Sequence, residues 1–305
     1  MVVVFEHFEW CFKDGHESFS EGLFRSLVAS FETTLMQTHK AKYPHFLMFV
    51  ASQKSRTFTK NFMRMLLEYS FSKSVPSETR ITCITCLSSF MARASSLDAE
   101  MLCSGLAPIM DWIRNFLISA STSQNDGTSA KLPFIKEYYA TCQALCYVLC
   151  FRTTHILNDP KGNGDQLLRE HRQTLHWMLS VHLETMKHCM ETIALEFLKT
   201  AKNFNLIDRK ILKSQRKSQD DDNKTNTNEV VTLNKPALTR SRFTHLGEFA
   251  QPGFGSRLYK RRLLDYKQFE NNMEAGGMGK GSNPLDSFFP FDPYLLRRSY
   301  KFQVS

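Results

Sequence analysis

The sequence lacks the features that mark several specialised classes of protein. Only 13 of its 305 residues are glycine and 10 are proline, which excludes collagen-like and low-complexity chains. The longest uninterrupted apolar run covers residues 144–151, whereas a membrane span needs about 18 residues. The apolar start, Met1 to Phe5, lacks the basic residues and long apolar core of a signal peptide. We therefore expect an intracellular, soluble protein without a membrane contact.

Motifs for catalysis are also lacking. The sequence contains no GxxxxGK[ST], GxGxxG, GxSxG or HExxH pattern. The run Gly276–Ser282 resembles a phosphate-binding loop superficially, but it lacks the Walker spacing and no strand precedes it, so we interpret it as a linker. The sequence therefore predicts a protein that is not an enzyme and that needs no cofactor.

The eight cysteines include one pair with the spacing of a zinc or redox site. Cys83 and Cys86 form a CxxC motif, but no second ligand pair follows at zinc-finger spacing, and the motif lies in a helical pattern. Cys142, Cys146 and Cys150 recur every four residues, as expected for small apolar side chains on one buried helical face. We interpret these cysteines as core residues, and a metal or redox site at Cys83 and Cys86 is the alternative.

Apolar and aromatic side chains are abundant and follow a helical period. Hydrophobic residues make up 42% of the chain, and 25 phenylalanines with 13 methionines can build a large core. Apolar residues recur at helical spacing in eight segments, namely 21–38, 45–54, 57–71, 77–94, 97–117, 134–151, 166–183 and 185–204. Turns or loops are predicted at Pro44, at 119–131 and at 159–164.

This pattern predicts an all-α fold. Helices of about 15–20 residues that pair along the chain are typical of a HEAT-repeat-like or armadillo α-solenoid. No repeat is visible at the residue level, so an irregular helical domain is the alternative. We expect HEAT-like helical repeats over 1–205 and a basic and acidic flexible loop over 206–257, disordered at 214–234. A terminal helix and an extended, aromatic, proline-rich tail follow over 258–305.

Positive charge is concentrated in the last third of the chain. Residues 1–205 carry a net charge of +2, whereas residues 206–305 carry +7. Such a segment attracts polyanions or acidic protein surfaces, so a scaffold with a nonspecific nucleic-acid-binding end is one alternative function. A basic segment that only aids solubility would explain the same charge. The candidate phosphate contacts are Arg240, Arg242, Arg257, Lys260, Arg261 and Arg262.

The C-terminal block carries the most specific pattern. It reads NPLDSFFPFDP over residues 283–293 and continues with Leu295, Leu296, Arg297, Arg298 and Ser299. This string resembles the C-terminal signature of the RNA polymerase I-specific transcription initiation factor family (transcription initiation factor IA). Shorter strings resemble the same family in the same order, at 38–39 with 46–49, at 89–94, at 139–152 and at 183–189.

The resemblance implies a HEAT-repeat adaptor that is not an enzyme and that works in the nucleus and nucleolus. Members of this family bind RNA polymerase I and link it to the promoter-bound selectivity factor for ribosomal RNA synthesis. Their free forms can be homodimers, and phosphorylation controls their activity. The resemblance covers the C-terminal half of the family pattern, so the polymerase contacts of the N-terminal half are not transferred to this sequence.

The C-terminal block supplies the candidate binding residues. Phe288, Phe289, Phe291 and Asp292 are candidates for partner binding, because aromatic side chains flanked by proline can anchor in a groove. The same block can instead fold back over the last helical repeat, and both interpretations stay open. Ser299 follows two arginines, as in sites of basophilic kinases, and is a candidate phosphosite, with a solvated basic turn as the alternative.

Overall fold

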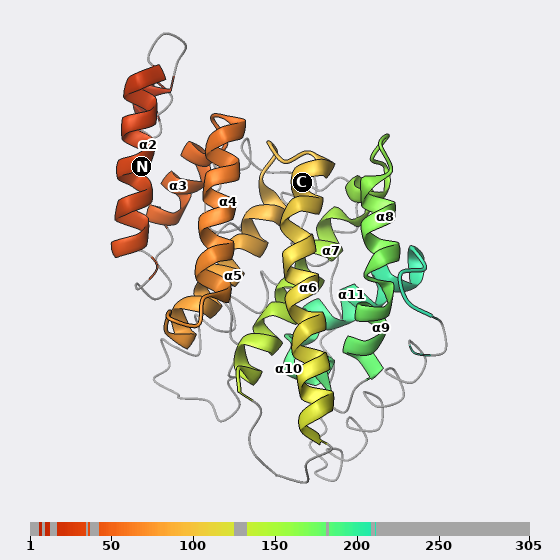
Figure 1. The fold of residues 1–305 in the computed structure, drawn as a ribbon. Coiled ribbons are helices and arrows are strands. Elements are labelled where there is room, and N and C mark those ends of the chain that lie inside the picture. Colours follow the sequence, from red (N-terminus) through yellow and green to blue (C-terminus); the bar gives the residue numbers. More distant parts are fainter. Residues whose placement is uncertain are drawn as a thin grey trace, which may run out of the picture.

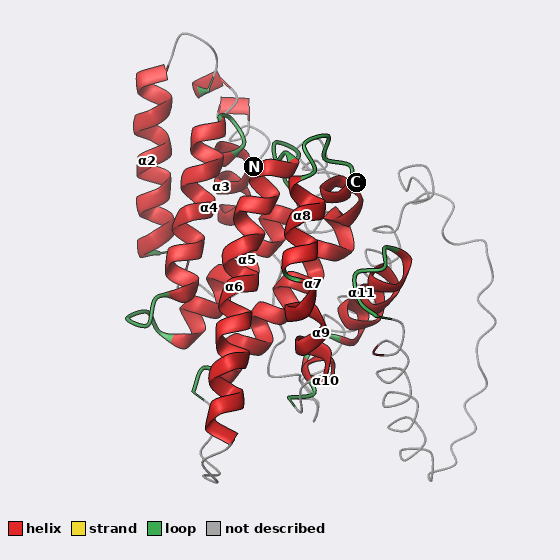
Figure 2. Cartoon of the chain, turned by 45° about the vertical axis from the view of Figure 1, so that its right-hand side comes forward, coloured by secondary structure: helices red, strands yellow, loops and turns green. Residues whose placement is uncertain are grey.

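The computed structural model describes residues 6–7, 10–12, 17–34, 36, 43–124, 133–180, 183–208 and 211. Within these residues the chain forms helices joined by turns and contains no strand (Figure 1, Figure 2). The helices are α2 (Glu17–Thr33), α3 (Tyr43–Ser52), α4 (Arg56–Phe71), α5 (Ser77–Arg93), α6 (Ala99–Gln124), α7 (Ile135–Leu157), α8 (Asn163–Glu170), α9 (Arg172–Ser180), α10 (Thr185–His188) and α11 (Glu191–Asn203). The all-α prediction is confirmed.

The helices are arranged in two layers (Figure 1). In the first layer, α6 packs between α4 on one side and α8 and α9 on the other. In the second layer, α7 packs between α5 and α11. From α4 to α7 successive helices alternate between the layers, which is the stacking of antiparallel pairs in a HEAT-type solenoid, and α8 and α9 then share the first layer. The predicted architecture is therefore confirmed.

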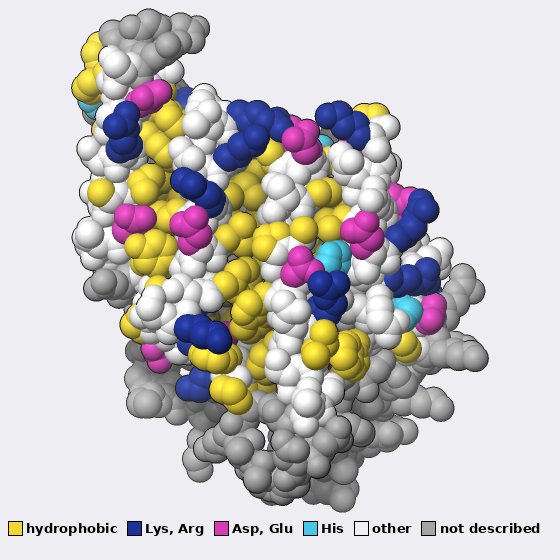
Figure 3. Space-filling model, in the orientation of Figure 1, with side chains coloured by type: hydrophobic (Ala, Val, Ile, Leu, Met, Phe, Trp, Pro, Cys, Tyr) yellow, Lys and Arg dark blue, Asp and Glu magenta, His cyan; other side chains and the backbone are white. Residues whose placement is uncertain are grey.

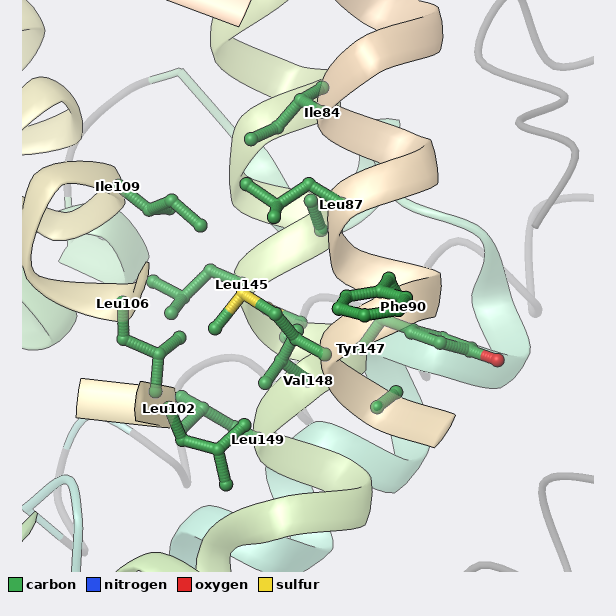
Figure 4. Close-up of a cluster of buried hydrophobic side chains, with 14 of the residues drawn as sticks. Ile84, Leu87, Phe90, Leu102, Leu106, Ile109, Leu145, Tyr147, Val148 and Leu149 are labelled. Carbon is green, nitrogen blue, oxygen red and sulfur yellow. The ribbon is translucent and has the colours of Figure 1, made fainter. Parts of the chain in front are cut away.

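The core lies between the two layers. Apolar side chains of α5, α6 and α7 meet there, among them Phe90, Leu106 and Leu145 (Figure 4). Each of these three residues has 0% of its surface exposed. Burial of such side chains contributes about 1.5–3 kcal/mol each, so this three-helix contact stabilises the fold.

Polar contacts join the turns at one end of the helix pairs. The Oε1 atom of Gln53, after α3, accepts hydrogen bonds from the backbone N–H groups of Ser95 and Ser96, at 2.8 and 3.3 Å. Arg56, at the start of α4, forms ion pairs with Asp98 and Glu100, at the start of α6. These exposed ion pairs stabilise the fold little, but together with the hydrogen bonds they fix how one pair of helices meets the next.

Three of the predicted segments differ from the observed helices: the loop over 119–131, the helix over 166–183, and the helix over 185–204, which contains α10 and α11. The predicted loop at 119–131 is wrong over its first six residues, because α6 continues to Gln124. The hydroxyl groups of Ser119, Ser121 and Thr122 donate hydrogen bonds to carbonyl oxygens four residues earlier, which accommodates polar residues in a helix. The segment predicted as one helix over 166–183 contains parts of two helices, α8 and α9, separated at His171.

Two predictions about the rest of the chain stay untested. The flexible loop over 206–257 and the terminal region over 258–305 lie outside the described residues, apart from 206–208 and 211, so these domain boundaries remain predictions. Among the described helices, none is long and apolar enough to cross a membrane.

Candidate protein-interaction surface

None of the candidate residues for partner binding, phosphate contact or phosphorylation lies in the described part of the chain. This applies to the block residues Phe288, Phe289, Phe291 and Asp292, to the basic residues Arg240, Arg242, Arg257, Lys260, Arg261 and Arg262, and to Ser299. The strings at 89–94, 139–152 and 183–189, which carry the family resemblance upstream, are described. The side-chain contacts of these three strings therefore lie within the described part of the chain.

Two of these strings contact each other directly. Arg152, near the end of α7, donates a hydrogen bond from Nε to the carbonyl oxygen of Met91 at 2.9 Å, and Nη2 donates to the carbonyl oxygen of Ala94. The guanidinium of Arg93 lies over the ring of Phe151, 3.8 Å from its centroid. The arginines and phenylalanine of these strings thus join the C-terminal end of α5 to α7.

Both arginines of this contact are enclosed. The exposed fraction is 3% for Arg93 and 2% for Arg152. Burial, together with the smaller effect of the nearby Arg93 charge, lowers the pKa of Arg152 to about 10. The hydrogen bonds of Arg152 to two carbonyl oxygens offset part of the cost of enclosing its charge.

The third string, at 183–189, also packs on α7. The side-chain Oε1 of Gln143 accepts a hydrogen bond from the backbone N–H of Met190 at 2.6 Å. The hydroxyl of Tyr139 donates to the carbonyl oxygen of Leu183 at 3.1 Å, and its ring stacks on His188 with 3.9 Å between centroids. The strings that resemble the family therefore converge on α7, the central helix of the second layer.

An ion pair between buried groups joins the other end of α5 to α7. Arg80 pairs with Glu137, and both side chains are at most 9% exposed. The ring of Phe134 lies over this guanidinium, 4.8 Å from centroid to Cζ. Phe134 holds a φ of 62°, a left-handed conformation that is strained for a residue with a side chain. This conformation occurs at the residue before α7, whose ring lies over the Arg80 guanidinium.

The CxxC motif lies inside the core. Cys83 and Cys86 are 0% and 1% exposed on α5, and the Cys83 thiol contacts the sulfur of Met36 at 3.2 Å. Burial raises the pKa of the Cys83 thiol to about 12 and that of Cys86 well above its usual value. Because a thiolate is the species that binds metal or attacks a disulfide, these thiols are poor candidates for either role. No group of three metal-ligating side chains occurs among the described residues.

The histidines of the region 171–188 are dispersed over different elements where they are described. His171 is buried between α8 and α9, and burial lowers its pKa. Nε2 of His176 accepts a hydrogen bond from the backbone N–H of Asp208 at 3.2 Å, and His188 is exposed against Tyr139. His182 lies outside the described residues. The three described side chains thus have structural contacts on different elements.

An aromatic stripe crosses the helices, and the sequence analysis missed it. It consists of Phe71, Trp112, Phe116, Tyr138, Tyr139 and His188, in which each ring contacts the next. Phe71, Trp112, Phe116 and Tyr139 are partly exposed. The i, i+4 spacing of Trp112 and Phe116 was the available signal, but periodicity cannot show that rings from four helices form one row.

The two layers differ in how much of their helix surface is exposed to solvent. On α6, in the first layer, exposed residues such as Arg114, Asn115 and Ile118 recur along the helix. Figure 3, which looks onto this layer, shows charged side chains spread among hydrophobic ones. On α7, in the second layer, the nine consecutive residues 141–149 are each at most 2% exposed. Every side of this part of α7 is therefore enclosed.

Comparison with known proteins identifies relatives of the whole chain. Residues 1–304 match the family model described as "RNA polymerase I specific transcription initiation factor RRN3". Curated relatives carry the name RNA polymerase I-specific transcription initiation factor RRN3. The protein of Schizosaccharomyces pombe is 26% identical over 281 residues, which are 91% of this chain and 37% of the relative. That of Mus musculus is 24% identical over 287 residues, 93% of this chain and 36% of the relative.

A further relative and a solved structure agree with this match. The protein of Saccharomyces cerevisiae is 28% identical over 182 residues, 59% of this chain and 28% of the relative. The crystal structure of RNA polymerase I transcription initiation factor Rrn3 has the same fold, with a TM-score of 0.63 at 22% identity over 76% of this chain and 46% of that chain. The chain thus spans less than two fifths of the length of these curated relatives. Because the family model matches nearly every residue, the chain belongs to the RNA polymerase I-specific transcription initiation factor RRN3 family.

Proposed function

We propose that this chain acts in transcription initiation by RNA polymerase I, as an adaptor that binds the polymerase and links it to the promoter-bound selectivity factor. The observation that carries the proposal is the match to the RRN3 family over residues 1–304. A solenoid of stacked helices supports it, because such a scaffold offers extended surfaces to large partners. A role without catalysis, in the nucleus and within it the nucleolus, is part of the same proposal.

The experiment is a pull-down of the tagged chain from nuclear extract at moderate salt, with bound proteins identified by mass spectrometry. The proposal expects subunits of RNA polymerase I, without those unique to polymerases II and III, and subunits of the selectivity factor. The matched control is the same chain with Arg80→Glu, which opposes two negative charges inside the α5–α7 contact and should disrupt the fold. Equal recovery by both chains would mean that the capture is nonspecific.

Phe288, Phe289, Phe291 and Asp292 are proposed as the anchoring segment for a partner. Clustered aromatic side chains supply much of the binding energy in protein interfaces. Phe289→Ala tests the role, with Phe302→Ala in the same tail as the control. Loss of polymerase recovery at an unchanged melting temperature supports partner anchoring, whereas a lowered melting temperature means that the block packs on its own chain.

A second candidate function is nonspecific DNA contact, favoured by the net charge of +7 over residues 206–305. Arg240, Arg242, Arg257, Lys260, Arg261 and Arg262 would bind phosphate groups and release counterions. Binding to a DNA duplex should then weaken steeply as salt rises, and replacing these six residues by glutamine should flatten the dependence. Absence of DNA retention near physiological salt would remove this function.

Two regulatory features complete the proposal. Ser299, after Arg297 and Arg298, is proposed as a site for a basophilic kinase, and mass spectrometry of the chain isolated from cells checks it by comparing wild type with Ser299→Ala.

A homodimer of the free protein is proposed from the family resemblance. Sedimentation at several concentrations checks it, and a single monomeric species throughout would contradict it.

A further inference from the structure

We propose that an apolar band between α4 and α6, on the solvent side of the first layer, binds an acidic amphipathic helix of a partner protein. The band consists of Leu67 and Phe71 on α4 and of Pro108 and Trp112 on α6. The inference deepens the proposed function, because it names the chemistry of a partner segment. It rests on that function only for the biological role of the partner, since binding to the band can be measured without RNA polymerase I.

Two contacts hold α4 beside α6. A Cβ added to Gly105 would lie 2.6 Å from Cε of Met63, so the helices approach closely there. Further along both helices, the ring of Phe71 stacks on Trp112 with 5.4 Å between centroids. The residue numbers increase on both helices from the first contact to the second, so α4 and α6 run parallel. At a rise of 1.5 Å per residue, the two contacts lie about 12 Å apart along α4.

The band lies between these two contacts and is open to solvent. Leu67 is midway between the contacts on α4, and Pro108 is midway between them on α6. These two residues, together with Phe71 and Trp112, are partly exposed. Figure 3 shows hydrophobic side chains gathered between α4 and α6 and visible from the solvent side. An apolar band between two parallel helices is the geometry that receives the apolar face of a third helix.

Uncompensated positive charge borders the band. Lys60 is exposed on α4, and its position seven residues before Leu67 places both side chains on the same side of the helix. Lys73 is exposed just beyond the end of α4. Neither lysine forms an ion pair with another described residue. The exposed residues of α6 within two turns of Pro108 and Trp112 on this side are uncharged, namely Ser104, Asn115 and Ser119.

The carboxylates of these two helices do not neutralise Lys60. Each carboxylate on α4, on α6 or at the start of α6 already lies in an ion pair with an arginine. The pairs are Glu68 with Arg64, Asp111 with Arg114, and Asp98 and Glu100 with Arg56. A partner that brings negative charge to the band therefore complements Lys60 and Lys73.

These observations define the partner segment. Apolar side chains at positions i, i+3 or i+4 and i+7 of a helix span about 11 Å, which matches the length of the band. Aspartate or glutamate on the flanks of that helix meets Lys60 and Lys73. Phe71 and Trp112 supply aromatic surface, which contributes much of the binding energy in protein interfaces. A nucleic acid would contact the lysines but would leave the apolar side chains without apolar partners, so the band favours a protein segment.

Two synthetic helical peptides test the proposal on the full chain. Both carry leucine and phenylalanine at i, i+3 and i+7, and the remaining positions carry glutamate in one peptide and lysine in the other. Fluorescence anisotropy of the labelled peptides measures Kd at moderate salt. The acidic peptide should bind saturably and the basic peptide about tenfold more weakly, corresponding to about 1.4 kcal/mol. Equal binding of both peptides, or no saturable binding of the acidic one, would overturn the proposal.

Charge reversal tests whether the peptide binds beside Lys60. Lys60→Glu should raise the Kd of the acidic peptide about tenfold. Lys202→Glu is the matched control, because Lys202 is an exposed lysine on α11 and its replacement changes the net charge of the chain equally. Both side chains are exposed, so the melting temperature should stay unchanged. Equal effects of the two substitutions would mean that net charge alone attracts the peptide, and the proposal would fall.

Photo-crosslinking locates the bound peptide. A benzophenone analogue of phenylalanine in place of Ser104 should crosslink to the acidic peptide, whereas the same analogue in place of Ser26 should not. Ser104 and Ser26 are both exposed helical serines, the latter on α2. Crosslinking from neither position, or equally from both, would contradict binding at the band. Crosslinks from position 104 to a second copy of the chain or to an added DNA duplex, in preference to the peptide, would assign the band to that occupant and overturn the proposal.

These outcomes are separate from the pull-down, because no polymerase is present. If the chain recovers RNA polymerase I but the band does not bind the acidic peptide, only the inference about the band fails. If the band binds the acidic peptide but no polymerase is recovered, the docking site stands and the adaptor function fails.

Discussion

At the scale of single residues, Arg152 shows how a charged side chain becomes part of a helical core. Its guanidinium donates to the carbonyl oxygens of Met91 and Ala94, which belong to the last turn of α5 and have no partner within that helix. A side chain of α7 therefore supplies the hydrogen bonds that the carbonyl oxygens at the C-terminal end of α5 lack within their own helix. Because the Arg152 side chain is enclosed, water cannot replace its hydrogen bonds to these carbonyl oxygens when the side chain is removed.

We expect Arg152→Met to lower the free energy of unfolding by about 2–4 kcal/mol, because two enclosed carbonyl oxygens lose their donors. Urea denaturation followed by circular dichroism measures the change. Arg169→Met is the control, since Arg169 is exposed and should change stability by about 0.5 kcal/mol or less. Equal effects of the two substitutions would contradict the structural role of Arg152.

His171 gives a pH-dependent contribution to stability. Burial lowers its pKa in the folded state below the ordinary value of 6.5, so the unfolded state takes up a proton first as the pH falls. Stability from this residue should be complete above pH 6.5 and should be lost as the pH falls through the folded pKa. His171→Gln should flatten the dependence of the unfolding midpoint over this range. An unchanged slope would show that other groups cause it.

The cysteines differ in accessibility, and this makes the position of the CxxC motif testable. Cys103 is half-buried, and burial together with Asp159 raises its pKa to about 11, whereas the other seven cysteines are buried. Alkylation of the native chain should modify Cys103 slowly and the others only after unfolding in urea. Rapid modification of Cys83 or Cys86 in the native chain would favour the metal or redox alternative.

At the scale of elements, close approach between helices explains two glycines. A Cβ added to Gly164 on α8 would lie 2.0 Å from the carbonyl oxygen of Ile156 on α7, which is backbone and cannot move without shifting the helix. A Cβ added to Gly105 on α6 would lie 2.6 Å from Cε of Met63 and 2.9 Å from Cε of Met91, which are ends of flexible side chains. Gly164 should therefore tolerate an added side chain less well than Gly105.

Gly164→Ala should lower the free energy of unfolding by about 2–3 kcal/mol, because the contact of α7 with α8 has to open. Gly105→Ala should cost less, since the methionine ends can move and alanine gains about 1 kcal/mol in helix propensity. Thermal unfolding of both variants gives the comparison. The reverse order of melting temperatures would contradict the packing between these helices.

Element positions were predictable where one strong signal acted alone. Pro76 before Ser77 and the apolar period that follows predicted the start of α5. The turn predicted at 159–164 separates α7 from α8, but α7 continues to Leu157, beyond its predicted end at Phe151. The continuation of α6 through Ser119 and Ser121 was missed, because side-chain hydrogen bonds to carbonyl oxygens make polar residues compatible with a helix. The break at His171 was missed because no proline or glycine marks it in the sequence.

At the scale of the whole molecule, the solenoid type could be predicted, whereas the contacts between its repeats could not. Helix length and pairing are local properties of the sequence, and they predicted a HEAT-type solenoid. The aromatic stripe and the contact of Arg152 with α5 join residues 40 to 60 positions apart, such as Phe71 with Trp112 and Met91 with Arg152. Periodicity carries no information about such pairs, so neither the aromatic stripe nor the Arg152 contact could be predicted from the sequence.

The central proposal is that this chain, which spans less than two fifths of the length of its curated relatives, makes a specific contact with RNA polymerase I. The most direct measurement is binding of the purified chain to immobilised, purified RNA polymerase I and, in parallel, to RNA polymerase II. The account predicts saturable binding to polymerase I that survives moderate salt and much weaker retention on polymerase II. No binding of the folded chain to polymerase I, or equal binding to both enzymes, would contradict it.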